Sequence, residues 1–174
     1  MPADRPRASA VQQEIRQSRP FASVWHEAAV ALLRTASVVR RAVERVVEPF
    51  GLSLAQYNAL RIVRGSGTAG IPTLAIRERM LEEGTTITRL LDKLEAAGLI
   101  ERERSLPDLR QVICRATAEG KQWLDEIDPV IDAADEEAVA ALGPRQLQQF
   151  IAMLDVVRQA NAERGAPRTM VGSG

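Results

Sequence analysis

The sequence contains little cysteine, few aromatic residues and no excess of charge of either sign. Its single cysteine, Cys114, excludes an internal disulfide framework and is typical of a cytoplasmic protein. Aromatic residues make up 3% of the chain, so small and branched aliphatic side chains supply most of its apolar mass, which favours helices. Because lysine plus arginine and aspartate plus glutamate both number 23, any surface for nucleic acid has to be local.

Long apolar runs are absent as well. No stretch approaches the roughly 20 apolar residues that span a bilayer, so no membrane partner is expected. Residues 1–20 include basic side chains with no apolar segment behind them, which does not fit a secretory signal. What is present, 45% apolar and 26% charged residues in a chain of 174, suits one globular domain with helical extensions.

A long helix is predicted near the N-terminus. Residues 21–47 contain neither glycine nor proline, and their apolar side chains recur every three or four positions. At 1.5 Å per residue this helix extends roughly 40 Å, more than a small core covers. We therefore expect it to find a partner helix from a second subunit. Pro49 and Gly51 mark its end.

The segment Gly65-Ser-Gly-Thr-Ala-Gly70 fits the spacing G-x-G-x-x-G of a dinucleotide-binding loop. Such a loop binds pyrophosphate only when a strand enters it and a helix follows directly. Here the preceding residues 54–64 have helical periodicity and start with a capping box at Ser53 and Gln56, and Pro72 follows the loop. We interpret the segment as a flexible connector between helices and expect no cofactor.

Two helices separated by a short turn follow the connector. Pro72 suits the first position of a helix over residues 73–80. A second helix is predicted over residues 85–97, with Gly98 as its C-terminal cap. Two helices joined by a short turn that contains glycine form a helix-turn-helix arrangement.

The second of these helices has one apolar face and one polar face. Thr85, Thr86, Thr88, Arg89 and Lys93 lie away from its leucines and isoleucine. Threonine hydroxyls and the free N–H groups of a helix start can bind phosphates, and an arginine can form a bidentate contact with a guanine edge. The pattern indicates a helix that reads DNA, although any surface helix shows a polar face.

A two-stranded ribbon is predicted next, because two short segments rich in β-branched residues flank a proline-containing loop at residues 105–109. Alternation places Arg102 and Arg104 on one side of the first strand. At the tip, Asp108 could hold the Arg110 guanidinium and direct it into a minor groove. An ordinary surface ion pair is the alternative interpretation, and the favoured one when that pair is taken alone.

The C-terminal part is predicted to be helical. Thr117 caps one helix, Asp128-Pro129 interrupts it with a kink or a break, and Gly143-Pro144 separates a last amphipathic helix over residues 145–158.

The order of these parts resembles the MarR family of bacterial transcription regulators over residues 54–120. The family's wing signature, D-x-R followed by T-x-x-G, occurs as Asp108-Leu-Arg110 and Thr117-Ala-Glu-Gly120, and residues 88–102 are similar to the family's recognition helix running into the wing. The resemblance implies a mainly α fold, namely a winged helix-turn-helix with a small β-ribbon wing and a helical dimerisation region.

The resemblance also implies a cytoplasmic homodimer that binds a near-palindromic operator in double-stranded DNA, as a repressor released by a small ligand. The implied parts are a flexible extension (1–20), a long helix of the dimerisation region (21–50), the DNA-binding domain (51–117), C-terminal dimerisation helices (118–164) and a disordered tail (165–174). The implied DNA contacts are Thr85, Thr86, Thr88, Arg89, Lys93, Arg102, Arg104, Asp108 and Arg110.

Family members often bind small aromatic acids, and four residues here suit such an effector: Trp25, His26, Tyr57 and Arg61. An aromatic wall with cationic anchors fits a phenolic carboxylate, but core packing explains Trp25 and Tyr57 equally well. No second ligand is spaced to help the single histidine bind a metal, and no catalytic triad or carboxylate pair stands out, so neither a metal site nor an enzyme is predicted. Cys114 shares a strand face with Val112 and is predicted to be buried and inert.

Two functions therefore stay open. The first is a dimeric DNA-binding regulator, and the alternative is a dimeric winged-helix module that binds a protein partner rather than DNA. Salt-dependent binding to duplex DNA distinguishes them.

Overall fold

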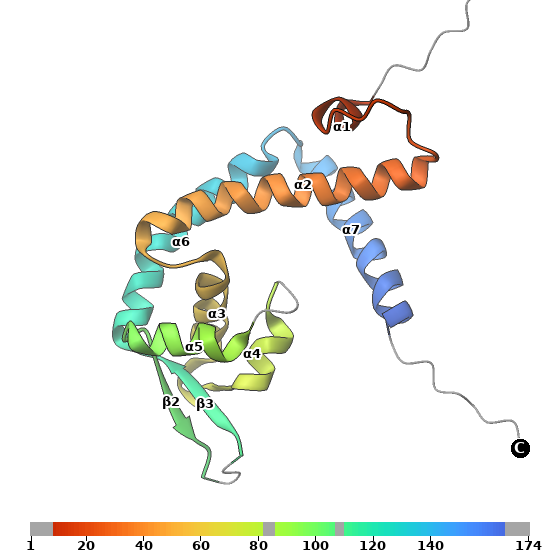
Figure 1. The fold of residues 1–174 in the computed structure, drawn as a ribbon. Helices are drawn as coiled ribbons and strands as arrows, with labels where there is room; N and C mark the ends of the chain where they lie inside the picture. The colour runs from red at the N-terminus through yellow and green to blue at the C-terminus, as the bar shows by residue number, and fades with distance from the viewer. Residues whose placement is uncertain (1–8, 82–85, 107–109, 166–174) are drawn as a thin grey trace, which may run out of the picture. The chain divides into compact units, whose positions relative to one another are not determined.

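The computed structural model describes residues 9–81, 86–106 and 110–165, and the chain divides into two compact units, residues 1–135 and 136–174 (Figure 1). The described fold is mainly helical, as predicted, with one small sheet. Its elements in chain order are α1 (Ala10–Glu14), α2 (Val24–Val47), the 3-10 turn η1 (Glu48–Phe50), α3 (Leu54–Gly65), the 3-10 turn η2 (Gly67–Ala69), β1 (Ile71–Pro72), α4 (Thr73–Arg79), α5 (Ile87–Ala96), β2 (Ile100–Arg104), β3 (Val112–Ala116), α6 (Ala118–Val139) and α7 (Pro144–Gly165).

The predicted long helix is confirmed as α2. It starts three residues later than the apolar pattern suggested, because the Ser23 hydroxyl caps it by accepting a hydrogen bond from the His26 N–H at 3.2 Å. It ends at Val47, and Gly51 adopts the left-handed conformation after the turn η1. The described part of the N-terminal extension contains α1, which contacts α2 and is joined to it by an ion pair between Glu14 and Arg34 at 3.2 Å.

Helix α3 lies at the centre of the first unit, where it contacts α2, α4, α5 and β3. Its predicted capping box is present, with the Ser53 N–H donating to the Gln56 Oε1 at 2.9 Å and the Gln56 N–H donating to the Ser53 Oγ at 3.3 Å. The core around α3 is formed by buried apolar side chains from elements between α2 and α6. They are Val43, Val47, Leu52, Tyr57, Ala59, Leu60, Val63, Ile71, Ile76, Leu90, Leu91, Leu94, Leu99, Ile100, Cys114, Leu124, Ile127 and Ile131.

The glycine-rich segment is entered by α3 and not by a strand, and it leads through the turn η2 into β1, so it does not connect two helices directly. Its last glycine has a further role that the sequence did not reveal. Gly70 has a φ of +72°, and a Cβ there would lie 2.7 Å from Ile113 Cγ2 and 2.8 Å from the Cys114 carbonyl oxygen. A side chain at this position would therefore push apart two strands of the sheet.

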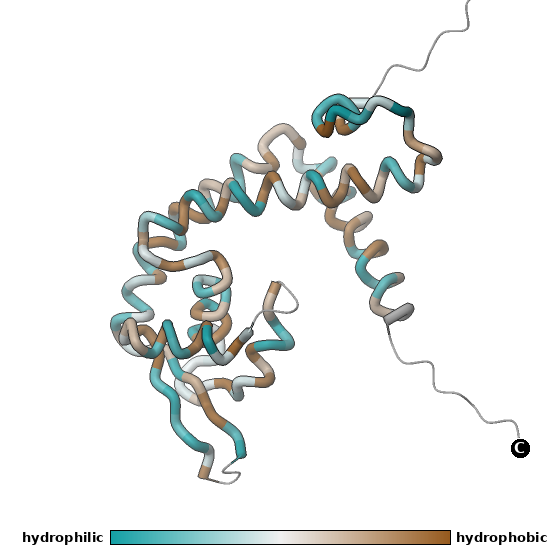
Figure 2. The backbone as a smooth tube through the Cα atoms, viewed as in Figure 1, coloured by the Kyte–Doolittle hydropathy of each residue, from teal (hydrophilic) through white to brown (hydrophobic). Residues whose placement is uncertain are grey.

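The sheet has three antiparallel strands in the order β1-β3-β2, so the predicted two-stranded ribbon is incomplete. Strand β1 pairs Ile71 with Cys114, and β2 pairs Arg102 with the same cysteine from the other side. Strand β1 was not predicted, because two residues show no periodicity and Pro72 was assigned to the first position of a helix. Pro72 instead lies in β1 and precedes α4 in extended conformation. Figure 2 shows the hydrophilic β2 beside the more hydrophobic β3.

Of the kink or break predicted at Asp128-Pro129, the break does not occur, because α6 runs through Pro129 as one helix. Ile127 and Ile131, on either side of the proline, are both buried in the core, and this packing holds the helix through the missing hydrogen bond. Helix α7 starts at Pro144, one residue before the predicted start, and extends beyond the predicted end to Gly165. None of the helices in the described ranges is long and apolar enough to cross a bilayer.

Candidate nucleic-acid interface

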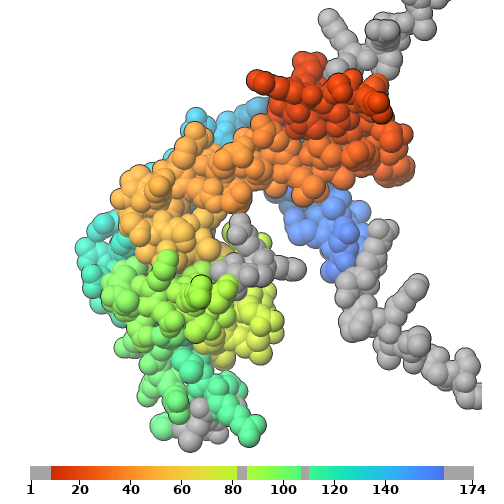
Figure 3. Space-filling view, in the orientation of Figure 1, coloured from red at the N-terminus to blue at the C-terminus, as the bar shows by residue number. Residues whose placement is uncertain are grey.

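Helix α5 turns its polar face outward. Leu90, Leu91 and Leu94 are buried against the core, whereas Thr88, Arg89 and Lys93 are exposed, as expected of a helix that is free to enter a groove. Thr86 is also exposed and directly precedes the helix, without a capping hydrogen bond from its side chain. Thr85 lies outside the described residues. Figure 3 shows α5 at the surface of the molecule, directly above the ribbon of β2 and β3.

The ribbon, or wing, adds exposed cations beyond α5. Arg104 ends β2 and is exposed, and Arg110 is exposed on the returning side of the tip. Asp108, the predicted partner of Arg110, lies outside the described residues. The two arginines therefore add exposed cations of the wing to those of α5.

A groove of about 560 Å³ joins the wing to the helix-turn-helix. Helix α4 contributes Thr73 and Arg77 to its lining, α5 contributes Ile87, and the returning side of the wing contributes Arg110 and Val112. None of the predicted DNA contacts lies in α4. The signal was available, because Arg77 and the exposed Arg79 lie in the last turn of the helix that precedes the recognition helix.

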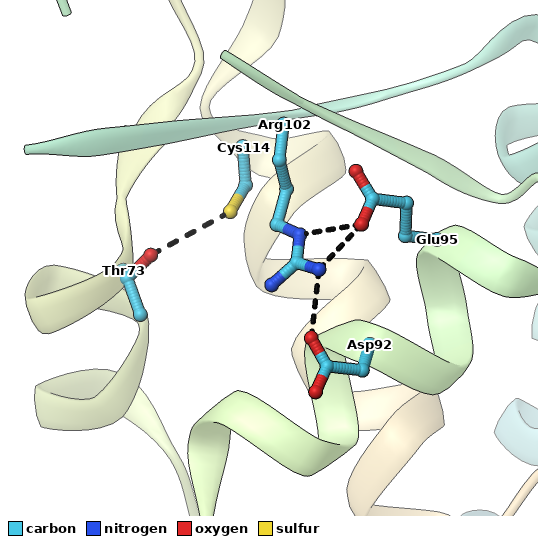
Figure 4. Close-up of polar contacts among 5 residues, drawn as sticks. All are labelled: Thr73, Asp92, Glu95, Arg102 and Cys114. Carbon is cyan, nitrogen blue, oxygen red and sulfur yellow. Dashed lines mark hydrogen bonds and ion pairs between the residues drawn. The ribbon is translucent and has the colours of Figure 1, made fainter. Parts of the chain in front are cut away.

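Arg102, predicted to contact DNA, is turned toward α5 (Figure 4). Its Nε donates to Glu95 Oε2 at 2.9 Å, and its terminal nitrogen donates to Asp92 Oδ1 at 2.7 Å and also to Glu95. The hydrogen bond from Arg102 lowers the pKa of the Glu95 carboxyl, and the same bond raises the pKa of the Arg102 guanidinium. This arrangement, the Arg102 bridge, ties the middle of β2 to the recognition helix.

The T-x-x-G motif forms the joint between α5, β2 and α6. The Thr117 hydroxyl donates to the Gly98 carbonyl oxygen at 2.7 Å and accepts from the Gly120 N–H at 2.9 Å. A Cβ on Gly120 would overlap the carbonyl oxygen of Leu99. The threonine and the glycine are therefore required for the close approach of the first turn of α6 to the end of the recognition helix.

The four candidate ligand residues do not meet within one chain. Tyr57 is 3% exposed, and its hydroxyl donates to Asp128 Oδ1 at 3.0 Å, while the Arg61 guanidinium lies 5.6 Å from its ring centre. Trp25 is 80% exposed at the far end of α2, where His26 packs against Phe21. Core packing thus explains Tyr57 but not Trp25.

Arg64 completes a polar network around Tyr57, because its guanidinium bonds both Asp125 and Asp128 of α6. Burial, helped by the hydrogen bond with Asp128, raises the pKa of Tyr57 to about 12. The network joins α3 to α6.

Cys114 is fully buried, as predicted, and its sulfur lies 3.9 Å from the Thr73 hydroxyl oxygen. Burial raises the pKa of its thiol, which disfavours the reactive thiolate form. Among the described residues, no group of three or more His, Cys, Asp or Glu side chains could hold a metal ion.

Comparisons with known proteins agree with this geometry. The family whose sequence model matches the chain is the MarR family, over residues 52–112. A solved MarR transcription factor from Planctomyces limnophilus is 30% identical, with 79% of this chain and 99% of that protein covered and a TM-score of 0.61.

Two further proteins extend the comparison. An HTH-type transcriptional repressor of Mycobacterium tuberculosis is 28% identical over 124 residues, which cover 71% of this chain and 88% of the repressor. The fold is also shared with Staphylococcus aureus MepR, solved as a DNA complex, at 21% identity and a TM-score of 0.68 over 75% of this chain and 96% of MepR.

Proposed function

The chain belongs to the MarR family of transcription regulators, and on this premise we propose that it acts as a homodimeric repressor on a near-palindromic DNA operator. The single observation that carries the proposal is the orientation of α5, which buries three leucines and exposes Thr88, Arg89 and Lys93 beside the basic wing. The related protein from M. tuberculosis is named as a repressor, and MepR of the same fold is solved with DNA, which supports this reading.

Each DNA-facing residue has a role that its chemistry suggests. Arg89 can form a bidentate contact with a guanine edge, and Lys93 can neutralise a phosphate. Thr86 and Thr88 can donate hydrogen bonds to phosphates near the start of α5. Arg104 and Arg110 of the wing suit the adjacent minor groove, where the negative potential is enhanced. Thr85 and Asp108 stay candidates for the same surface, outside the described residues.

The homodimer is supported by apolar side chains that remain exposed among the described residues. On α2, Trp25 is 80% and Leu33 is 71% exposed. On α7, Ile151 and Val156 are more than half exposed. Exposed apolar stripes on long helices suit pairing with a second copy, which would present two wings to two half-sites.

We also propose that a small aromatic acid releases the repressor from DNA. Tyr57 and Arg61 lie together in the chain, but Trp25 and His26 lie at the other end of α2. A cleft that uses all four residues would need Trp25 and His26 from the second subunit. We expect the regulator to work in the cytoplasm, without enzymatic turnover.

The proposal is tested by selecting duplexes from a random DNA library with the full chain and titrating a labelled selected duplex by fluorescence anisotropy. We expect affinity to fall steeply between about 50 and 200 mM salt. Arg110→Ala should weaken binding by more than about tenfold while the chain stays folded. The matched control Arg145→Ala removes one positive charge from α7 and should leave the affinity unchanged.

Absent or salt-insensitive DNA binding would overturn the proposal and favour the second candidate, a winged-helix module for a protein partner. Unchanged affinity in the Arg110→Ala variant would remove the wing from the mechanism.

A further inference from the structure

The Arg102 bridge joins two elements that have to reach DNA together. Arg102 lies at the midpoint of β2, and its partners Asp92 and Glu95 lie one turn apart on the recognition helix. The side chains of Asp92 and Glu95 remain 52% and 40% exposed, whereas the Arg102 side chain between them is 22% exposed. The arginine is thus largely committed to the protein, although a basic residue of the wing would be expected to face a phosphate.

The two carboxylates lie where negative charge is unfavourable for DNA binding. Asp92 follows Arg89 by three positions and precedes Lys93, and both of these cations are exposed. Residues three apart on a helix are neighbours, so an unpaired Asp92 would oppose the contact of Arg89 with DNA. A guanidinium that donates to both carboxylates offsets this charge at close range.

The bridge also sets where the wing points. Arg102 is on the strand face that includes Ile100 and Cys114, which are buried, so the side chain is directed at the body of the unit. Arg104, two residues further along β2, ends the strand and is exposed. Fixing β2 at Arg102 therefore determines the direction in which Arg104 and the wing tip approach a duplex. Exposed ion pairs add little to stability, so the effect expected here is on orientation.

We propose that Arg102 is a positioning residue of the DNA-binding surface, which holds the wing in register with the recognition helix and neutralises the two carboxylates of that helix. This inference rests on the proposed DNA-binding function. It replaces the direct DNA contact that the sequence assigned to Arg102.

The first test compares Arg102→Ala and Arg102→Lys with the unaltered full chain, using the selected duplex of the previous section. Arg102→Ala should weaken binding by about tenfold or more, because two carboxylates lose their cation and the wing loses its anchor. Arg102→Lys keeps the charge but not the planar fork, and should still weaken binding by about threefold or more. A direct phosphate contact would tolerate lysine.

The second test exchanges the two charges. Arg102→Glu combined with Glu95→Arg rebuilds the pair in the opposite sense and should bind within about threefold of the unaltered chain. The control combines Arg102→Glu with Glu101→Arg, which has the same net charge but places the new cation on the exposed face of β2 opposite α5. The control should stay about tenfold weaker.

A third measurement needs no DNA. Amide hydrogen exchange in β2 and β3 should be faster in Arg102→Ala and in the control than in the exchanged pair, because the wing is no longer held at its midpoint. This readout separates a displaced wing from a variant that has lost its fold.

The outcomes are distinct. Unchanged affinity in Arg102→Ala, or equal recovery in the exchanged pair and its control, would overturn the positioning role while leaving the DNA-binding function intact. If the unaltered chain selects no duplex, the proposed function fails and this inference fails with it, whatever the exchange data show about the bridge.

Discussion

The winged part of the molecule buries many of its apolar side chains, whereas the long helices α2 and α7 leave most of theirs at least partly exposed. In the winged part, α3 buries four side chains and α5 buries three, and the sheet contributes Ile71, Ile100 and Cys114. Helix α2, with 24 residues, buries Val43 and Val47, and none of the described side chains of α7 is buried. The winged part is complete within one chain, whereas the long helices keep an apolar surface that suits a second copy.

The largest effect on stability is expected at Gly120, where α6 packs against the Leu99 carbonyl. Glycine inside a helix is normally less stable than alanine by about 0.5–1 kcal/mol, but alanine at position 120 would overlap the Leu99 carbonyl. We expect Gly120→Ala to lower the free energy of unfolding by about 3 kcal/mol or more, measured by urea denaturation.

Gly65 in α3 is the control for this substitution, because a Cβ there meets nothing within 4 Å. Gly65→Ala should change the stability by less than about 1 kcal/mol. Equal effects at the two glycines would contradict the account of the joint.

The next largest effect is expected on self-association through the exposed apolar face of α2. Leu33→Glu places a charge on the exposed apolar face of α2 and should weaken self-association by about a hundredfold, measured by sedimentation velocity. The winged part should keep its structure, since Leu33 is not part of its core. Thr35→Glu, which adds the same charge at another exposed position of α2, should affect assembly far less. If both variants dissociate alike, the apolar face is not the interface.

A moderate effect on the pH dependence of stability is expected from Tyr57, the only tyrosine of the chain. Its pKa is raised from 10.0 to about 12 in the folded chain, so the unfolded chain loses this proton first as the pH rises. The contribution of Tyr57 to the free energy of unfolding is complete below pH 10. It falls by ~2 kcal/mol as the pH rises toward 12. Absorbance of tyrosinate should show this late titration, and Tyr57→Phe should remove that part of the pH dependence. A midpoint near 10 in the folded chain would contradict the burial of Tyr57.

The smallest effect is expected for Cys114, whose thiol should not react while the chain is folded. Because burial raises the pKa of Cys114, a thiol reagent at about pH 7 should leave the folded chain unmodified and label it after unfolding in urea. Rapid labelling of the folded chain would show that the sheet opens around this residue.

The parts of the fold that were predicted from sequence rest on local patterns. The apolar period of α2, the capping box at Ser53 and the leucine face of α5 each involve residues within one element. The exposed Thr88, Arg89 and Lys93 follow from the same period, because burial of the leucines directs the polar face outward.

The parts that were missed depend on contacts between distant residues. Strand β1 exists because Gly70 lets Ile71 approach Cys114, and α6 continues through Pro129 because Ile127 and Ile131 pack into the core. The direction of Arg102 depends on carboxylates seven and ten residues earlier in the chain, in another element. The period of the strand places Arg102 on the same face as Ile100, but it does not show that Asp92 and Glu95 will receive the guanidinium there.

The central claim is that two copies of the chain present α5 and the wing to one duplex. It is tested most directly by measuring the stoichiometry and the salt dependence of binding to a selected duplex, by sedimentation equilibrium and anisotropy on the same samples. The account predicts two chains per duplex and a slope of log affinity against log salt of about −3 or steeper, since each neutralised phosphate contributes about −0.9. One chain per duplex, or affinity that does not change with salt, would contradict it.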